Sequence, residues 1–147
     1  MEAKNLINKK YKKDFQNHLL EQYKIYVKSA DDVSSRRLIS NNFYLTINSI
    51  IFGLVSYFSV MNRDRILILL SLVGIIISVS WYLNIRSYRK LNSAKFRVIH
   101  NIEEYLPIRP YTIEDYHINK NYKTTITEAY IPLAFMVLYL ILLYVYG

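Results

Sequence analysis

The chain has 147 residues, of which 52% are hydrophobic, and its mean hydropathy is +0.08 at a net charge of +8. This composition excludes an ordinary soluble domain and predicts a small integral membrane protein with charged segments between its spans. The absence of cysteine excludes disulfide and thiol chemistry, and the placement of Lys and Arg between apolar runs favours topology control or lipid binding over nucleic-acid binding.

Residues 1–42 are expected to form a basic N-terminal arm that contains an amphipathic helix. The first forty residues hold no apolar run followed by a small-residue cleavage site, so we expect no removable signal peptide. Side chains that recur at steps of three and four within residues 5–29 predict one helix face: Ile7, Tyr11, Phe15, Leu19, Gln22 and Tyr26. This face either packs on neighbouring helices or, with the lysines near its start, lies on anionic lipid. Asp31 and Asp32 predict the N-cap of the next helix.

Residues 43–85 predict a transmembrane hairpin. Its first span covers residues 43–61 and carries no charge, and as a helix it is about 28 Å long, close to the hydrocarbon thickness of a bilayer. The second span covers residues 66–85. The loop between them, residues 62–65, is short enough to force the two spans to run antiparallel.

Small and polar residues follow one stripe on each of the two spans. The first span carries Thr46, Ser49, Gly53 and Ser56, and the second carries Ser71, Gly74 and Ser78. Such spacing lets two membrane helices approach closely, so we expect the spans to pack on each other; the alternative is that either stripe lines a water-filled lumen. Asn48, deep in the first span, needs a partner in hydrocarbon and is expected to form an interhelical hydrogen bond rather than an ion site.

The second span is expected to continue without a break into a long cytosolic amphipathic helix, because no helix breaker occurs before Pro107. The whole helix is then roughly 60 Å long, about twice the thickness of the hydrocarbon core. One face of its cytosolic half predicts an apolar oligomer seam: Leu91, Ala94, Val98, Ile102 and Tyr105. Another face is mainly basic: Arg86, Arg89, Arg97 and His100. This basic face either anchors the helix at lipid headgroups, forms a charged ring at the mouth of a pore, or binds nucleic acid.

Residues 86–128 form the cytosolic helical segment, in which Thr112 is placed to cap a short helix. Residues 129–146 are a third apolar run and predict a third span. Of the 19 Lys and Arg residues, nine lie in residues 1–42, eight in residues 86–128 and two in the hairpin loop. The positive-inside rule therefore places the N-terminus in the cytosol and the C-terminus outside.

The residue types present argue against an enzyme and against a cofactor. His100 lies near Glu103 and Glu104, but neither of the other histidines belongs to a metal-ligand motif, so no metal site is expected. Three glycines in the whole chain leave no room for a phosphate-binding loop, and no nucleophile elbow occurs. Three thin spans cannot enclose a channel alone, so the stripes and the seam predict self-association into a ring.

Two stretches of the sequence resemble the RipA-like family of small bacterial membrane proteins, over roughly residues 20–145. The residues that carry the resemblance are Ser35, Arg36, Arg37, residues 41–49, Trp81, residues 87–92 and 94–96, Glu103, Leu106, Pro107, Glu128, Ile131, Pro132 and Phe135. The pattern is also similar to the pore-forming accessory protein of type VI-B CRISPR systems. The resemblance implies an octameric ring in the bacterial cytoplasmic membrane, in some relatives a pore, and it carries over no catalytic residue.

We therefore predict an all-α protein with three transmembrane helices that assembles into a homo-oligomeric ring of about eight subunits in the lipid bilayer. The predicted function is that of a channel or membrane-perturbing effector, in stress response or phage defence. The alternative is a membrane-anchored platform that recruits a cytosolic protein through residues 86–107.

Overall fold

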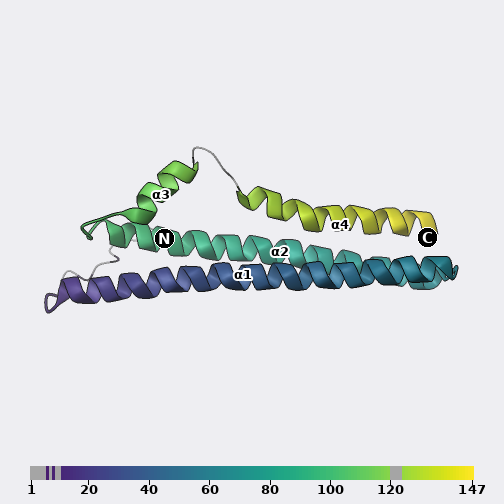
Figure 1. The fold of residues 1–147 in the computed structure, drawn as a ribbon, viewed down its shortest axis with the longest axis horizontal. Helices are drawn as coiled ribbons and strands as arrows, with labels where there is room; N and C mark the ends of the chain where they lie inside the picture. Colours follow the sequence, from purple (N-terminus) through teal and green to yellow (C-terminus); the bar gives the residue numbers. More distant parts are fainter. Residues whose placement is uncertain (1–5, 7, 9–10, 120–123) are drawn as a thin grey trace. The chain divides into compact units, whose positions relative to one another are not determined.

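The computed structural model describes residues 6, 8, 11–119 and 124–147. Four helices follow one another in this part of the chain, and it contains no strand: α1 (Phe15–Val60), α2 (Asp64–Glu103), α3 (Pro110–Asn119) and α4 (Thr124–Tyr146) (Figure 1). Three of the helices are long and apolar enough to cross a membrane, namely α1, α2 and residues 128–146 of α4. The predicted all-α class with three membrane spans is confirmed.

Helix α2 is continuous over 40 residues, as predicted from the lack of a breaker before Pro107. Only Met61, Asn62 and Arg63 separate it from α1, and Asn62 has a φ of +51°, in the left-handed region. Asparagine tolerates that conformation better than other side chains, because its short polar group bonds locally. After this short connection α2 packs back on α1, with Ile51, Val55 and Leu67 in one buried cluster.

Helix α1 differs from the prediction at two points. It begins at Phe15 rather than near residue 5, after Asp14, whose φ is +50°. It also continues through Asp31 and Asp32 without the expected new start. Aspartate caps a helix only where the chain leaves helical geometry, and its cost inside a helix is under about 1 kcal/mol. The buried side chains on either side of the pair, Ala30 and Val33, keep this stretch packed and helical.

The chain divides into two units. The first is formed by residues 1–35 and 89–122, and the second by residues 36–88 and 123–147, within the limits of the described residues. Helices α1 and α2 each contribute one part to each unit. The first unit contains α3, and the second contains α4.

The second unit has a core that joins α1, α2 and α4. Ile51 and Val55 of α1, Leu67 of α2 and Tyr139 of α4 are its buried members. Aromatic contacts extend this core, since the ring of Phe52 lies 6.2 Å from Phe135 and 5.9 Å from Tyr139. Burial of these side chains holds α4 against the hairpin.

The first unit is held by parts of α1, α2 and α3. Its buried apolar side chains are Leu19, Ala30 and Val33 from α1, and Ile99 and Ile102 from α2. The ring of Tyr111 from α3 lies 5.8 Å from that of Phe96 on α2. The same unit also buries one carboxylate, Glu103, whose environment is described below.

Candidate functional site

A buried group of hydrogen bonds joins the three spans of the second unit. Asn48 of α1 is fully buried, and its Nδ2 donates to the carbonyl oxygen of Tyr44 at 2.8 Å. Its Oδ1 accepts from the hydroxyl of Ser78 on α2 at 3.3 Å and from the hydroxyl of Tyr139 on α4 at 3.2 Å. The amide thus has partners on both other spans, which satisfies a polar group that would be costly in hydrocarbon.

Tyr139 was not predicted from the sequence as a partner of this group. It lies within an apolar run, where the sequence does not distinguish a tyrosine at the membrane interface from one in the protein core. Its ring is fully buried and lies directly against Gly74 of α2. A Cβ built on Gly74 would stand 2.4 Å from Cζ of Tyr139, so only glycine allows this approach.

The sequence predicts that the small-residue stripes of the two spans pack on each other. The structure shows that they do not. The stripe of α2 is buried in the protomer: Ser71 and Ser78 are at most 1% exposed, and Gly74 contacts α4. Around a Cβ built on Gly53 of α1, no neighbouring atom lies within 4 Å. Helix α4, whose contacts the sequence did not specify, occupies the position that we had assigned to the first span.

The stripe of α1, formed by Thr46, Ser49, Gly53 and Ser56, is exposed on the protomer. Its three hydroxyl groups donate to the carbonyl four residues earlier, at 2.8 to 3.0 Å. Each oxygen keeps acceptor capacity toward water or toward another chain. Its role in lining a pore or in packing between copies stays a prediction.

Polar contacts also join the helices of the second unit at the predicted inner interface. The indole Nε1 of Trp81 donates to Oδ1 of Asn41 at 2.9 Å, and the same ring stacks on Tyr44 at 5.9 Å. Arg37 of α1 and Glu128 of α4 form an ion pair at 3.7 Å. These contacts tie the beginning of the third span to α1.

In the first unit, Glu103 at the end of α2 binds the beginning of α3. Its carboxylate accepts from the backbone N–H of Tyr111 at 3.0 Å and from that of Thr112 at 2.9 Å. It also accepts from the hydroxyl of Thr112 at 2.6 Å and from the hydroxyl of Tyr23 on α1 at 2.9 Å. The side chain is fully buried, and the four donors stabilise its negative charge in place of water.

These contacts shift the acid–base behaviour of the group. Burial raises the pKa of Glu103, but the hydrogen bonds from Thr112, Tyr111 and Tyr23 outweigh burial, so the pKa lies below its ordinary value. Burial, followed by the bond to Glu103, raises the pKa of the Tyr23 hydroxyl. Glu103 is therefore ionised at neutral pH, and Tyr23 keeps its proton.

The predicted capping role of Thr112 is wrong. Helix α3 begins at Pro110, so Thr112 lies inside its first turn, and a carboxylate from α2 binds the free N–H groups there. Proline is well suited to the first helical position, because it has no N–H to satisfy. Among the described residues no group of three metal-ligating side chains occurs, which includes the neighbourhood of His100, Glu103 and Glu104.

The predicted basic face of α2 is only partly exposed. Arg86 in the second unit and Arg89 and Arg97 in the first unit are exposed. His100 is half-buried with its ring 6.3 Å from that of Phe96, and its buried Nε2 has no hydrogen-bond partner. A charged ring formed by the three arginines stays a prediction. His100 does not share their exposure, so it does not fit the predicted ring.

The predicted oligomer seam requires a correction. Ile102 is buried within the protomer, Val98 is half-buried, and Tyr105 lies beyond the end of α2. The half-buried and buried positions of this helix also include Asn92, Lys95 and Ile99, and the amino group of Lys95 donates to the hydroxyl of Ser29 on α1. The sequence pattern followed apolar side chains, whereas the helix pair also buries polar ones. Leu91 and Ala94 remain exposed and free for another copy.

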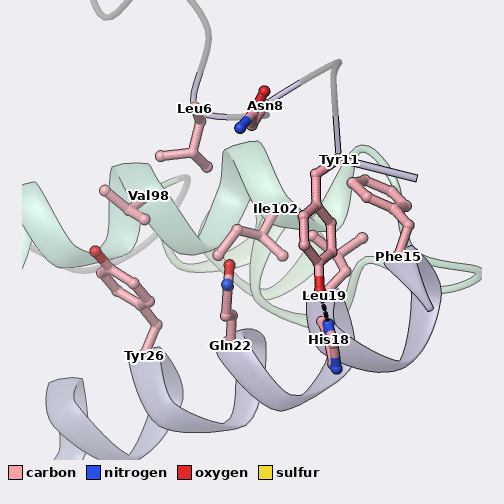
Figure 2. A pocket seen from close by; sticks show the side chains of 10 residues that line it. All are labelled: Leu6, Asn8, Tyr11, Phe15, His18, Leu19, Gln22, Tyr26, Val98 and Ile102. Carbon is pink, nitrogen blue, oxygen red and sulfur yellow. Dashed lines mark hydrogen bonds between the residues drawn. The ribbon is translucent and has the colours of Figure 1, made fainter. Parts of the chain in front are cut away.

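Part of the predicted N-terminal stripe lines a cavity of about 480 Å³ in the first unit (Figure 2). Phe15, Leu19, Gln22 and Tyr26 of α1 face Val98 and Ile102 of α2, with Tyr11, Leu6 and Asn8 on the N-terminal side. The hydroxyl of Tyr11 and Nδ1 of His18 share a hydrogen bond. The predicted stripe member Ile7 lies outside the described residues.

Comparison with known families gives a match over most of the chain. A model described as the octameric membrane protein family (8xMP) matches residues 20–147. This chain belongs to that family. Comparison with curated proteins and with solved structures gave no match.

Membership of the octameric membrane protein family confirms the resemblance to a family of small octameric membrane proteins, and with it a homo-oligomer in a membrane. The match covers the whole second unit and the first unit from residue 20 on, and it includes the buried Asn48 and Glu103. Surfaces that are exposed on the single protomer therefore include those that contact other copies in the octamer.

Proposed function

We propose that the octamer is a channel or a membrane-perturbing effector, with the exposed stripe of α1 lining the transmembrane part of its lumen. The observation that carries the proposal is the contrast between the two stripes. Ser71, Gly74 and Ser78 are buried within the protomer, whereas Thr46, Ser49, Gly53 and Ser56 are exposed. Small hydroxyl-bearing side chains on an exposed face of a membrane helix favour water or close helix contact over lipid.

Exposed arginines on α2 also support the proposal that the octamer conducts ions. Arg86, Arg89 and Arg97 are exposed on α2, and eight copies would multiply each of them around the axis. Rings of positive charge at a pore mouth attract anions and repel cations. We therefore propose that the channel prefers anions.

Single-channel recording from the purified octamer in a planar bilayer tests the proposal. Replacing Ser49 and Ser56 with leucine is expected to lower conductance by roughly tenfold or more, because the lumen becomes narrow and apolar. Ser80 provides the matched control: it is also exposed and also donates to the carbonyl four residues earlier, but it lies on α2. Ser80→Leu is expected to leave conductance unchanged.

Changing Arg86, Arg89 and Arg97 to glutamate is expected to reverse the ion preference of the same octamer. Unchanged conductance and selectivity in all of these variants, with the octamer intact, would contradict a lumen at these residues. The rival function is then favoured, namely a membrane-anchored platform that recruits a cytosolic protein. A stoichiometric partner, together with liposomes that do not leak, would support that rival.

We also propose that the protein resides in a bacterial cytoplasmic membrane with its N-terminus in the cytosol, and that it acts in stress response or phage defence. The count of Lys and Arg on each side of the spans supports the orientation. The similarity to the CRISPR accessory pore protein supports the defence role. We propose no enzymatic activity, on the ground that the sequence carries no catalytic motif.

A further inference from the structure

The first unit exposes apolar side chains on two separate elements. On α2, Leu91 is 47% exposed, and it lies beside the exposed Ala94 and Lys90. On and just before α3, Ile113 is 58% exposed and Ile108 is 72% exposed. Both stretches belong to a unit rich in charged residues, where water rather than lipid is the expected surrounding, so covering these side chains is favourable.

The two surfaces carry opposite charge. Helix α3 contains the exposed Glu114 and Asp115 and no Lys or Arg from Pro110 to Asn119. The surface of α2 carries Lys90 next to Leu91. On α1, the exposed Lys24 is already paired with Glu21 at 2.8 Å. Opposite charges next to apolar groups favour contact between the α2 and α3 surfaces over contact of either with itself.

Helix α3 is fixed in place within the first unit. The four hydrogen bonds to Glu103 hold its first turn against α1 and α2, and Tyr111 packs against Phe96. A surface on α3 is therefore preorganised for docking and loses little conformational entropy when it binds.

A closed ring of eight identical chains needs two different surfaces on each chain, because contacts run head to tail. The family is octameric, and the first unit offers two such surfaces of opposite charge. We propose that the outer face of α3, with Ile113 and Glu114, docks on the α2 surface of the next copy, formed by Lys90, Leu91 and Ala94. This contact closes the ring through the first unit, and it does not depend on whether the octamer conducts ions.

Cross-linking tests the contact directly, because the chain contains no cysteine. Copies with Leu91→Cys and copies with Ile113→Cys, each with a different tag, are coexpressed and oxidised in the membrane. Dimers that contain one copy of each kind are expected, and neither variant expressed alone should cross-link to itself. The control pair is Ile25→Cys with Leu91→Cys, since Ile25 is 64% exposed on α1 but lies outside both surfaces.

Charge reversal gives a second measurement on the full-length protein. Lys90→Glu is expected to lower the octamer fraction in native mass spectra at least threefold, and adding Glu114→Lys to the same chain should restore it. Lys28→Glu, an equally exposed change on α1, should leave the octamer intact. The proposal would be overturned if Leu91→Cys copies cross-linked to each other or to Ile25→Cys copies rather than to Ile113→Cys copies. It would also be overturned if Lys90→Glu left the octamer fraction unchanged.

Discussion

At the residue scale, Glu103 determines how firmly α3 is held. Glu103→Gln keeps the shape of the side chain but removes the negative charge to which four groups donate hydrogen bonds. The free energy of local opening of α3 should therefore fall by about 1–3 kcal/mol. Hydrogen exchange of the α3 amides in the detergent-solubilised octamer measures this opening. Glu104→Gln is the matched control, because Glu104 is the next residue in the sequence but is exposed and lacks these contacts.

The pH dependence of the same measurement has a defined sign. The pKa of Glu103 is lower in the folded protein than its ordinary value of 4.5, so its stabilising contribution is fully present above pH 4.5 and is lost as pH falls through the folded pKa. Protection of α3 in the wild type should therefore fall toward that of Glu103→Gln in acid. A constant difference between the two proteins from pH 7 down to pH 3 would show that the charge of Glu103 is not what holds α3.

Single residues were also where sequence reasoning succeeded or failed most clearly. Asn48 was correctly expected to need an interhelical partner, because burial of an amide in hydrocarbon leaves no other option. The role of Glu103 was not recognised, because its partners lie on other helices: Tyr111 and Thr112 on α3, and Tyr23, 80 residues away in sequence, on α1. Local patterns specify caps within one helix, but they carry no information on a cap supplied by another helix.

At the scale of the elements, Gly74 allows α2 and α4 to pack closely. The added methyl group of Gly74→Ala would clash with the ring of Tyr139, so this substitution should destabilise the docking of α4 by about 1–3 kcal/mol. Unfolding of the protein by increasing dodecyl sulfate, followed by circular dichroism, measures the change. Gly53→Ala meets no neighbour in the protomer, so it should not weaken the docking of α4.

A double variant distinguishes the proposed clash from a general loss of stability. Tyr139→Leu removes the ring, and Gly74→Ala should then cost much less than it does in the wild type, because the two residues are in contact. An equal cost of Gly74→Ala in both backgrounds would mean that the close approach of α4 to α2 is not the cause.

The elements also show how far periodicity predicts packing. The continuous α2 was predicted because no breaker interrupts it, and the three spans because their apolar runs are long. The start of α1 and its passage through Asp31 and Asp32 were missed, since a possible cap and a tolerated interior aspartate look alike in sequence. The choice between two small-residue stripes depended on α4, whose apolar run has no stripe of its own to indicate its contacts.

At the scale of the whole molecule, an odd number of spans places the two ends of the chain on opposite sides of the membrane. Seventeen of the 19 Lys and Arg residues lie in residues 1–42 and 86–128, so these segments should be cytosolic and the C-terminus should lie outside. Alkaline phosphatase fused after Gly147 should be active, because it folds only outside the cytosol, whereas green fluorescent protein fused there should be dark. Fused before Met1, the fluorescent protein should be bright.

The orientation matters for every surface discussed above. The predicted orientation would place the α2 and α3 surfaces and the exposed arginines in the cytosol, where soluble partners and cytosolic anions would reach them. As a control, adding four lysines to the loop at residues 62–65 should weaken the pattern of the two reporters, because it reduces the charge asymmetry that sets the orientation. Active phosphatase at the N-terminus of the unmodified chain would instead place the arginines outside, and a cytosolic platform would then be impossible.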